Sequence, residues 1–198
     1  MPFLTGFGFA VLGYLFGSLP FAVWVTHMRK GTDVRDAGSR HATATNTMRQ
    51  AGWAAGVLVL VLDIAKGFLP VYLAREVGIG LWGVAVTAGM VVVGHCWPIL
   101  AGFRGGMGLA AAGGTLLAVS PLGFLIGVAL LILLVLVIHH SARASVVTGL
   151  LMPWVFLLFG LRGNIIGVAL AVGIVVAIRF LIDWNRRYRE LWLDRPAP

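Results

Sequence analysis

Two segments of this chain concentrate the residue types that bind phosphate. The first, residues 26–50, reads T-H-M-R-K-G-T-D-V-R-D-A-G-S-R-H-A-T-A-T-N-T-M-R-Q, so hydroxyl, amide and guanidinium groups recur along it. Arginine matches phosphate oxygens with two parallel hydrogen bonds, and hydroxyl and amide groups add further donors. Beside a membrane, the same composition is also typical of a solvated, positively charged loop. Taken alone, this segment leaves both interpretations open.

The second segment, residues 94–108, is rich in glycine and reads G-H-C-W-P-I-L-A-G-F-R-G-G-M-G. Glycines let main-chain N–H groups surround an anion, and the helix expected to follow would add the positive end of its dipole. Gly105, Gly106 and Gly108 suit such an anion site, although glycine is also common where membrane helices pack closely. Neither the Walker spacing nor the dinucleotide glycine pattern is present, which favours a phosphate site over a nucleotide site.

Other ionisable residues give weaker indications. Asp63 and Lys66 lie three residues apart on one face of an expected helix, where a functional role or a structural ion pair is possible, and the ion pair is favoured. His95 has no further Cys, Asp or Glu at ligand spacing, so no metal site is expected. No Ser-His-Asp order or paired carboxylates occur, which argues against a conventional general-base mechanism.

The elements that position these groups are membrane helices. Hydrophobic residues make up 60% of the 198 residues, charged residues only 11%, and mean hydropathy is +0.97, far outside the range of soluble proteins. One domain covers residues 1–198. The single cysteine, Cys96, permits no internal disulfide. No basic residue precedes the first apolar run, so a cleaved signal peptide is not expected.

Apolar runs predict an all-α polytopic membrane protein, a bundle of seven transmembrane helices. The predicted spans cover residues 4–26, 51–74, 79–100, 108–120, 122–139, 144–160 and 164–182. The fourth span is short and rich in Gly and Ala. This suits a helix that packs closely against its neighbours or crosses only part of the membrane.

Basic residues in the connections predict the orientation. Because successive spans cross the membrane in opposite directions, one side of the membrane receives most of the basic residues, namely Arg29, Lys30, Arg35, Arg40, Arg49, Arg104, Arg143, Arg179, Arg186, Arg187, Arg189 and Arg195. The other side receives Arg75 and Arg162, and Lys66 lies within a span. Lys and Arg accumulate in cytoplasmic loops, so we expect the N-terminus outside and the C-terminus in the cytoplasm. Anionic lipids attract such a basic face, and residues 183–195 read as an interfacial amphipathic helix; nucleic-acid binding is not expected.

The polar motifs resemble one family in their order and spacing. They are Gly17–Pro20 (G-S-L-P), Asp36–Asn46 (D-A-G-S-R-H-A-T-A-T-N) with Arg49, Leu62–Gly67 (L-D-I-A-K-G), Gly94–Pro98 (G-H-C-W-P) and Phe103–Gly108 (F-R-G-G-M-G). Together they resemble the bacterial acyl-phosphate glycerol-3-phosphate acyltransferase family, PlsY. The resemblance implies a seven-span enzyme of the bacterial inner membrane, with its active site facing the cytoplasm. It also implies acyl transfer from acyl phosphate to the 1-hydroxyl of glycerol 3-phosphate, giving lysophosphatidic acid, with no cofactor.

The resemblance also implies a set of site residues. It assigns catalysis to Ser39, Arg49 and His95. The substrate-binding residues that we expect are Arg40, Thr45, Asn46, Gly94, Arg104, Gly105, Gly106, Gly108, Arg143 and Ser145.

Several positions depart from the family pattern. The first motif is usually G-S-G-N-x-G-A-T-N, and here Arg40, His41 and Thr43 replace its inner Gly, Asn and Gly. Met107 replaces a phosphate-contacting Lys, for which Arg40, His41 or Arg143 can compensate. The C-terminal His-Arg-x-x-Asn motif is not clearly present, and its nearest counterpart is residues 179–185. An alternative is therefore a non-catalytic phosphate- or lipid-binding membrane relative, or an acyltransferase with a changed acceptor. A transporter would need inverted repeats, which are not evident.

Overall fold

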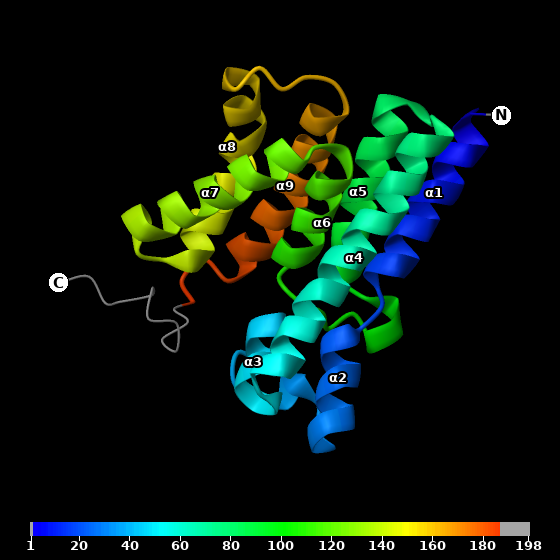
Figure 1. The fold of residues 1–198 in the computed structure, drawn as a ribbon. Coiled ribbons are helices and arrows are strands. Elements are labelled where there is room, and N and C mark those ends of the chain that lie inside the picture. The colour runs from blue at the N-terminus through cyan, green and yellow to red at the C-terminus, as the bar shows by residue number, and fades with distance from the viewer. Residues whose placement is uncertain (1, 187–198) are drawn as a thin grey trace.

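The computed structural model describes residues 2–186, and over that range every regular element is a helix (Figure 1). The elements in chain order are α1 (Pro2–Gly17), α2 (Phe21–Lys30), η1 (Val34–Asp36), α3 (Ala44–Ala51), α4 (Trp53–Val77), α5 (Gly80–Cys96), η2 (Ile99–Ala101), α6 (Leu109–Val119), α7 (Pro121–Ile138), α8 (Ser141–Leu158) and α9 (Asn164–Ile182). Residues 187–198, and with them most of the predicted amphipathic tail, lie outside the described range. Residues 183–185 form a turn after α9.

Six helical stretches in the described part are long and apolar enough to cross a membrane. They are Leu4–Lys30, Trp53–Val77, Gly80–Ala101, Pro121–Ile138, Ser141–Leu158 and Asn164–Ile182. The remaining predicted span is α6, with 11 residues. At about 1.5 Å per residue, α6 reaches roughly half of the ~30 Å hydrocarbon core. The chain is therefore an all-helical, multi-pass membrane protein, and the fourth predicted span is a short helix inside the bundle.

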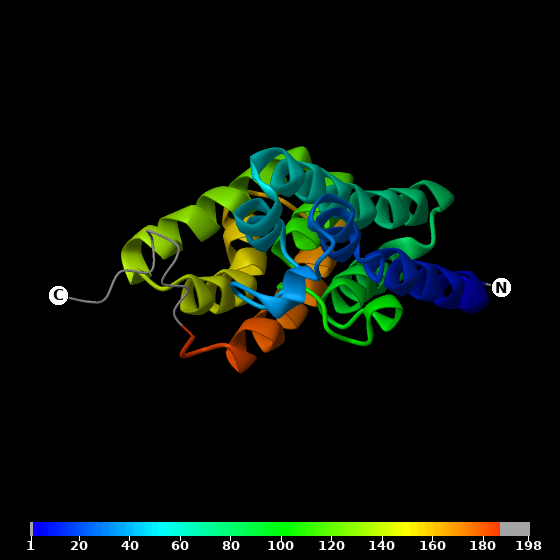
Figure 2. The ribbon, with the colours of Figure 1, turned by 90° about the horizontal axis from the view of Figure 1, so that it is seen from below.

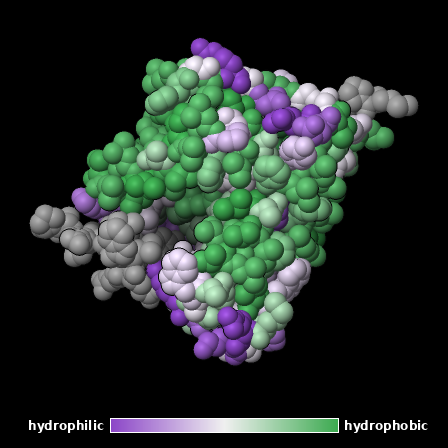
Figure 3. Space-filling model, in the orientation of Figure 1, coloured by the Kyte–Doolittle hydropathy of each residue, from purple (hydrophilic) through white to green (hydrophobic). Residues whose placement is uncertain are grey.

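The surface has the distribution that a membrane requires. Figure 3 shows apolar side chains in a broad belt, with hydrophilic residues gathered above and below it. The C-terminal end of α4 and the α8–α9 connection lie at the upper end in Figure 1, and α2 and α3 lie at the lower end. The elements that carry Arg75 and Arg162 are thus separated from those that carry Arg29, Lys30 and Arg49.

The first predicted span is two helices, because the chain breaks at residues 18–20. Pro20 lacks an N–H group and restricts the residue before it, which ends α1 and restarts the helix as α2. The break leaves a main-chain oxygen at Leu19 without its usual helical partner. Lys66 of α4 donates to that oxygen at 2.8 Å from the ammonium nitrogen, so the buried amine stabilises the break.

Close helix contacts bring α6 to the centre of the bundle. A Cβ atom at Gly114 of α6 would collide with the main chain of α4 at Ile64, and one at Gly67 of α4 would collide with the main chain of α6 at Ala111. Glycine at both positions lets the two backbones touch, which is how membrane helices pack without large side chains. The N-terminus of α6 is thereby fixed beside the middle of α4.

Candidate active site

The described residues enclose one large cavity, with a volume of about 470 Å³, at the lower end of the bundle. Its lining residues are Ser39, His41, Thr43, Ala44, Thr45, Arg49, Leu60, Asp63, Ile64, His95, Met107, Gly108, Leu109, Ala110, Gly113, Phe124, Val128, Ser141, Ser145 and Phe180. Polar residues come mainly from the two segments singled out above, and apolar residues come mainly from α4, α6 and α7. We call the part lined by the two polar segments the polar end of the cavity, and the part lined by α4, α6 and α7 its apolar end.

The apolar end faces the membrane belt. Leu60 of α4, Leu109 of α6 and Val128 of α7 line the cavity and are also exposed on the surface. The helix α6 packs against both α4 and α7 and forms the back wall between them. In Figure 3 the surface is hollowed between the α7 region and the α3–α4 end. The cavity is therefore open toward the apolar belt on this side.

Asn46 organises the first polar segment. Its fully buried amide donates to the main-chain oxygens of Val34, Ala37 and His41 at 2.7–3.2 Å, and its own oxygen accepts from the N–H of Ser39. The Thr43 hydroxyl accepts from the N–H of Asn46 and caps α3. The segment folds into a turn around the Asn46 side chain, which leaves Ser39 on the cavity wall.

The Gly-rich segment passes behind the cavity. The N–H of Gly106 donates to the main-chain oxygen of His95 at 3.0 Å, and the N–H of Ala42 donates to that of Gly105 at 3.3 Å. A Cβ atom at Gly106 would collide with the imidazole of His95. Glycine here allows the loop, the His95 side chain and the first polar segment to touch. Gly108, with φ of +89°, turns the chain into α6.

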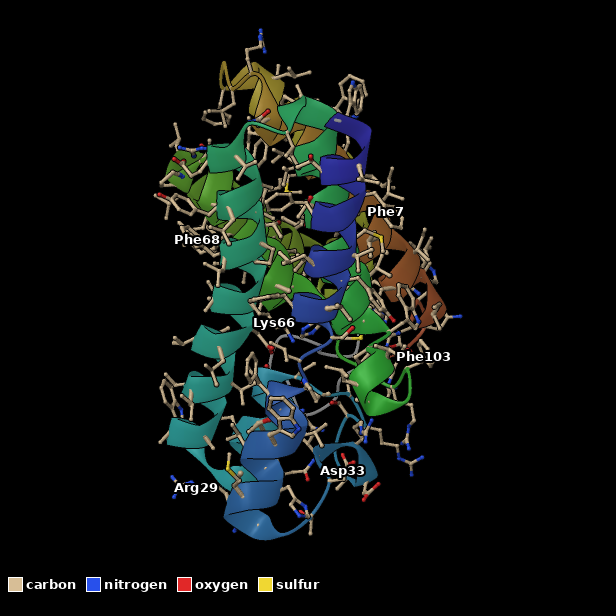
Figure 4. All side chains as sticks on the ribbon, turned by 90° about the vertical axis from the view of Figure 1, so that its right-hand side faces the viewer. Phe7, Arg29, Asp33, Lys66, Phe68 and Phe103 are labelled. Carbon is tan, nitrogen blue, oxygen red and sulfur yellow. The ribbon has the colours of Figure 1, made fainter. Side chains whose placement is uncertain are left out.

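Asp63, Lys66 and His95 form a buried cluster. The Lys66 ammonium lies 2.9 Å from the Asp63 carboxylate, and the two nearest atoms of His95 and Asp63 are 3.7 Å apart. Figure 4 shows Lys66 reaching from α4 toward the junction of α1 and α2, above the labelled Arg29 and Asp33. The contact of Lys66 with Leu19 supports the structural ion pair. Asp63 and His95 nevertheless also line the cavity.

The two polar segments are tied together at their outer edge. Arg35 pairs with Asp33 at 2.6 Å and donates to the main-chain oxygens of Ala101 at 2.7 Å and Arg104 at 3.1 Å. The hydrogen bond from Arg35 holds the pKa of the Asp33 carboxyl below its usual value. A charged pair thus cross-links the two loops.

The end of α9 contacts both polar segments. The imidazole Nε2 of His41 lies 3.2 Å from the Asp183 carboxylate. Arg186 donates to the main-chain oxygen of Ser39 at 2.6 Å, and Arg179 donates to that of Gly106 at 3.1 Å. Burial, together with Arg179 and Arg186, lowers the pKa of His41 to about 4 against the opposing effect of Asp183. His41 is therefore neutral at neutral pH. In Figure 2, seen from below, the segment joining α2 and α3 crosses the middle of the molecule near the end of α9.

The structure divides the predicted site residues into two groups. Those on the wall of the large cavity are Ser39, Thr45, Arg49, His95, Gly108 and Ser145. Those away from its wall are Arg40, Asn46, Gly94, Arg104, Gly105, Gly106 and Arg143.

The residues of the second group lie in different surroundings. Gly94 packs α5 against α1, because a Cβ atom there would collide with the main chain at Tyr14. Arg104, Gly105 and Gly106 border a small pocket of about 10 Å³, which shares Asp63 and His95 with the wall of the large cavity. Arg40 is exposed, and Arg143 lies over the Trp184 ring at 5.5 Å. Neither arginine replaces the charge that Met107 lacks on the cavity wall.

Sequence reasoning missed the residues at the end of α9. Arg179 and Asp183 fall in the stretch that was compared with the C-terminal family motif, but their pairing with His41 and Gly106 depends on tertiary contacts. Asp63 was identified as a buried ion-pair residue, and its place on the cavity wall was not predicted. The described residues contain no group of three or more His, Cys, Asp or Glu arranged to hold a metal ion.

Comparisons with known proteins agree on one family. The family model described as glycerol-3-phosphate acyltransferase matches residues 7–190. A glycerol-3-phosphate acyltransferase of Rubrobacter xylanophilus is 41% identical over 150 residues, covering 76% of this chain and 75% of the relative. One from Pseudomonas aeruginosa is 37% identical over 189 residues, covering 94% and 95%.

Solved structures give the same result for the fold. The crystal structure of PlsY, an integral membrane glycerol 3-phosphate acyltransferase, in its glycerol 3-phosphate form is similar with a TM-score of 0.79 and 32% identity, covering 92% of this chain and 91% of that chain. The lysophosphatidic acid form of PlsY has a TM-score of 0.77 and 30% identity, with the same coverage.

Proposed function

Since this chain belongs to the glycerol-3-phosphate acyltransferase family, we propose that it transfers an acyl chain from an acyl phosphate to the 1-hydroxyl of glycerol 3-phosphate. The products are lysophosphatidic acid and inorganic phosphate. The relatives are named for glycerol 3-phosphate, and the acyl-phosphate donor is our assignment for this chain.

The observation that carries the proposal is the two-ended cavity. Both the acyl phosphate and the lysophosphatidic acid have an anionic head and a long alkyl chain. The cavity offers hydroxyl groups and a guanidinium from Ser39, Thr45 and Arg49 at one end, and Leu60, Ile64 and Phe124 at the other. A site with convergent polar groups and an apolar arm fits an amphiphile better than it fits a free sugar phosphate.

The chemistry needs little from the protein beyond positioning. An acyl phosphate is a mixed anhydride, so its carbonyl carbon is already activated. The glycerol 1-oxygen forms a bond to that carbon, and the bond between the carbon and the bridging phosphate oxygen breaks. The leaving phosphate takes the hydroxyl proton. Holding the two substrates together accounts for much of the expected rate enhancement, which explains a site without a conventional base.

The side chains on the polar wall have distinct proposed roles. Arg49 supplies positive charge for the phosphate groups, and the hydroxyls of Ser39, Thr45 and Ser145 orient oxygens of the substrates. His95 is buried between the Gly-rich loop and Asp63. Its imidazole would face the oxyanion that develops on the acyl carbonyl, with the Asp63 carboxylate 3.7 Å from Nδ1 of the ring.

The opening between α4 and α7 suggests how the lipid substrates move. An acyl phosphate dissolved in the bilayer would enter with its chain among Leu60, Leu109 and Val128, and lysophosphatidic acid would leave the same way. Water-soluble glycerol 3-phosphate would reach the polar end from the aqueous side. The accumulation of basic residues on the connections at that end supports a cytoplasmic location at the bacterial inner membrane.

Phosphate release from palmitoyl phosphate by the purified protein in lipid vesicles, with and without glycerol 3-phosphate, tests the proposal. We expect release that depends on glycerol 3-phosphate and is reduced about a hundredfold or more in Ser39→Ala. A Thr5→Ala variant, altered at the other end of the bundle, serves as the control. Binding of glycerol 3-phosphate without any release would refute the acyltransferase and favour the non-catalytic alternative. Phosphate release that occurs with another polyol phosphate but not with glycerol 3-phosphate would indicate a changed acceptor.

A further inference from the structure

The turn that carries Ser39 is held in part by its own main chain, because the N–H of Arg40 donates to the oxygen of Ala37 at 3.2 Å and the N–H of Thr43 donates to that of His41 at 3.0 Å. Its central residue, Arg40, has φ of +59°, a left-handed conformation that costs free energy in any residue with a Cβ atom. Within the turn, the N–H of His41 reaches the Ser39 hydroxyl only at 3.4 Å. Asn46 holds the turn from one side. The N–H of Ala42 also donates to the main-chain oxygen of Gly105 at 3.3 Å, and side chains of α9 add further contacts to the turn.

The end of α9 supplies contacts on both sides of Arg40. Arg186 donates to the main-chain oxygen of Ser39 at 2.6 Å, and Asp183 lies 3.2 Å from the His41 ring. These two contacts hold the residues before and after the strained position. They join parts of the chain that are more than 140 residues apart.

Asp183 is the centre of this support because two guanidinium groups share its carboxylate. Arg179 lies 3.7 Å from one carboxylate oxygen, and Arg186 lies 3.8 Å from the other. Arg179 also donates to the main-chain oxygen of Gly106, in the second polar segment. Without the carboxylate, the two arginines would repel each other in a partly buried place. Their contacts with Ser39 and Gly106 would then weaken together.

We propose that Asp183 is a positioning residue, which acts through His41 and Arg186 to hold the 39–43 turn and so fixes Ser39 for the acceptor substrate. This inference rests on the proposed acyltransferase function. Asp183 is absent from the cavity wall, whereas Ser39, His41 and Thr43 are on it. The carboxylate therefore acts on substrate through other side chains.

Steady-state kinetics of Asp183→Asn, His41→Ala and the double variant test the proposal, with glycerol 3-phosphate as the varied substrate. Asp183→Asn should lower kcat/KM by about ten- to a hundredfold, mainly through a higher KM, as expected when a charge-assisted support is lost. The two substitutions should be coupled, so the double variant should be much less impaired than the product of the single effects predicts. Glu76→Gln, which removes the same charge at the opposite end of the bundle, should leave both constants unchanged.

A second measurement separates this proposal from the proposed function and from misfolding. The rise in melting temperature with added glycerol 3-phosphate reports binding without turnover, and it should shrink in Asp183→Asn and in Arg186→Gln. If the wild type binds glycerol 3-phosphate but releases no phosphate, the acyltransferase assignment fails while the positioning role can still be read from binding. The positioning role would be overturned if Asp183→Asn left both the KM for glycerol 3-phosphate and the thermal shift unchanged. It would also be overturned if the effects of Asp183→Asn and His41→Ala on kcat/KM simply multiplied in the double variant. Should Asp183→Asn fail to fold, Arg186→Gln decides the outcome by the same criteria.

Discussion

At the scale of single residues, the departure from the family motif at Arg40 affects backbone strain as well as charge. Arg40 stands where the motif usually has glycine, and the backbone keeps the left-handed conformation that glycine adopts at low cost. The arginine side chain is exposed and away from the cavity wall. This substitution therefore introduces strain and adds no charge to the cavity wall.

Arg40→Gly should consequently stabilise the protein. We expect the free energy of unfolding to rise by about 0.5–1 kcal/mol. This is the free energy recovered when the left-handed strain is removed, minus the entropic cost of the greater flexibility of glycine in the unfolded chain. Arg40→Ala is the matched control, because it removes the same charge and retains the Cβ atom that causes the strain. Thermal unfolding in detergent measures both variants. Equal melting temperatures for the two variants would mean that the strain is not what limits stability here.

His41 should make stability depend on pH. Its pKa of about 4 in the folded protein lies below the ordinary value of 6.5, so the unfolded chain binds the proton more readily. Stability should therefore decrease as the pH falls from 6.5 toward 4, and this contribution should vanish in His41→Asn. Melting temperatures of the two proteins at pH 7 and pH 4.5 provide the comparison. If the melting temperatures of the wild type and of His41→Asn fall by the same amount between pH 7 and pH 4.5, the pH dependence does not come from His41.

At the scale of elements, the contact between α4 and α6 determines where the cavity lies. The main chain of Ile64 occupies the space that a Cβ atom at Gly114 would need. Backbone cannot move aside as a side chain can, so the helices must separate or the protein must lose stability. The wall that carries Asp63, Ile64, Leu109 and Ala110 depends on this contact.

Gly114→Ala should therefore destabilise the protein by about 2 kcal/mol or more, even though alanine favours helices. Gly8→Ala in α1 is the control, since no atom lies within 4 Å of its added Cβ. Melting temperatures in detergent should fall for Gly114→Ala and stay level or rise slightly for Gly8→Ala. Comparable behaviour of the two variants would contradict the close backbone contact.

At the scale of the whole molecule, the distribution of charge predicts the orientation in the membrane. The buried native Cys96 can be replaced by serine, and single cysteines can be placed at exposed Met28 of α2 and Glu76 of α4. Their helix ends lie at opposite ends of the bundle. We expect an impermeant thiol reagent to label position 28 only in inverted vesicles and position 76 only in right-side-out vesicles. The reverse pattern would place the polar end of the cavity outside the cell.

The sequence by itself determined the class of protein and most of its helices. Long apolar runs are decisive because backbone polar groups in a bilayer must be satisfied within a helix, so composition alone selects the secondary structure. The polar motifs and the family resemblance also pointed to Ser39, Thr45, Arg49 and His95, which lie together on the cavity wall. Their roles in binding and catalysis stay predictions. The sequence also predicted that α6 is short, because the apolar run that contains it covers only residues 108–120.

Only the tertiary structure decided which of these residues share a cavity. Asn46 and Gly94 have the residue types of a binding site, yet one amide folds a turn and one glycine packs two helices, because those roles depend on neighbours distant in the chain. The break at Pro20 is stabilised by Lys66, which lies 47 residues away in the chain from its acceptor Leu19. The support of Ser39 by Asp183 and Arg186 joins distant segments, and local patterns carry no information about such pairings. The proposed site therefore depends on long-range contacts at the ends of helices, whereas the sequence predicts those helices one by one.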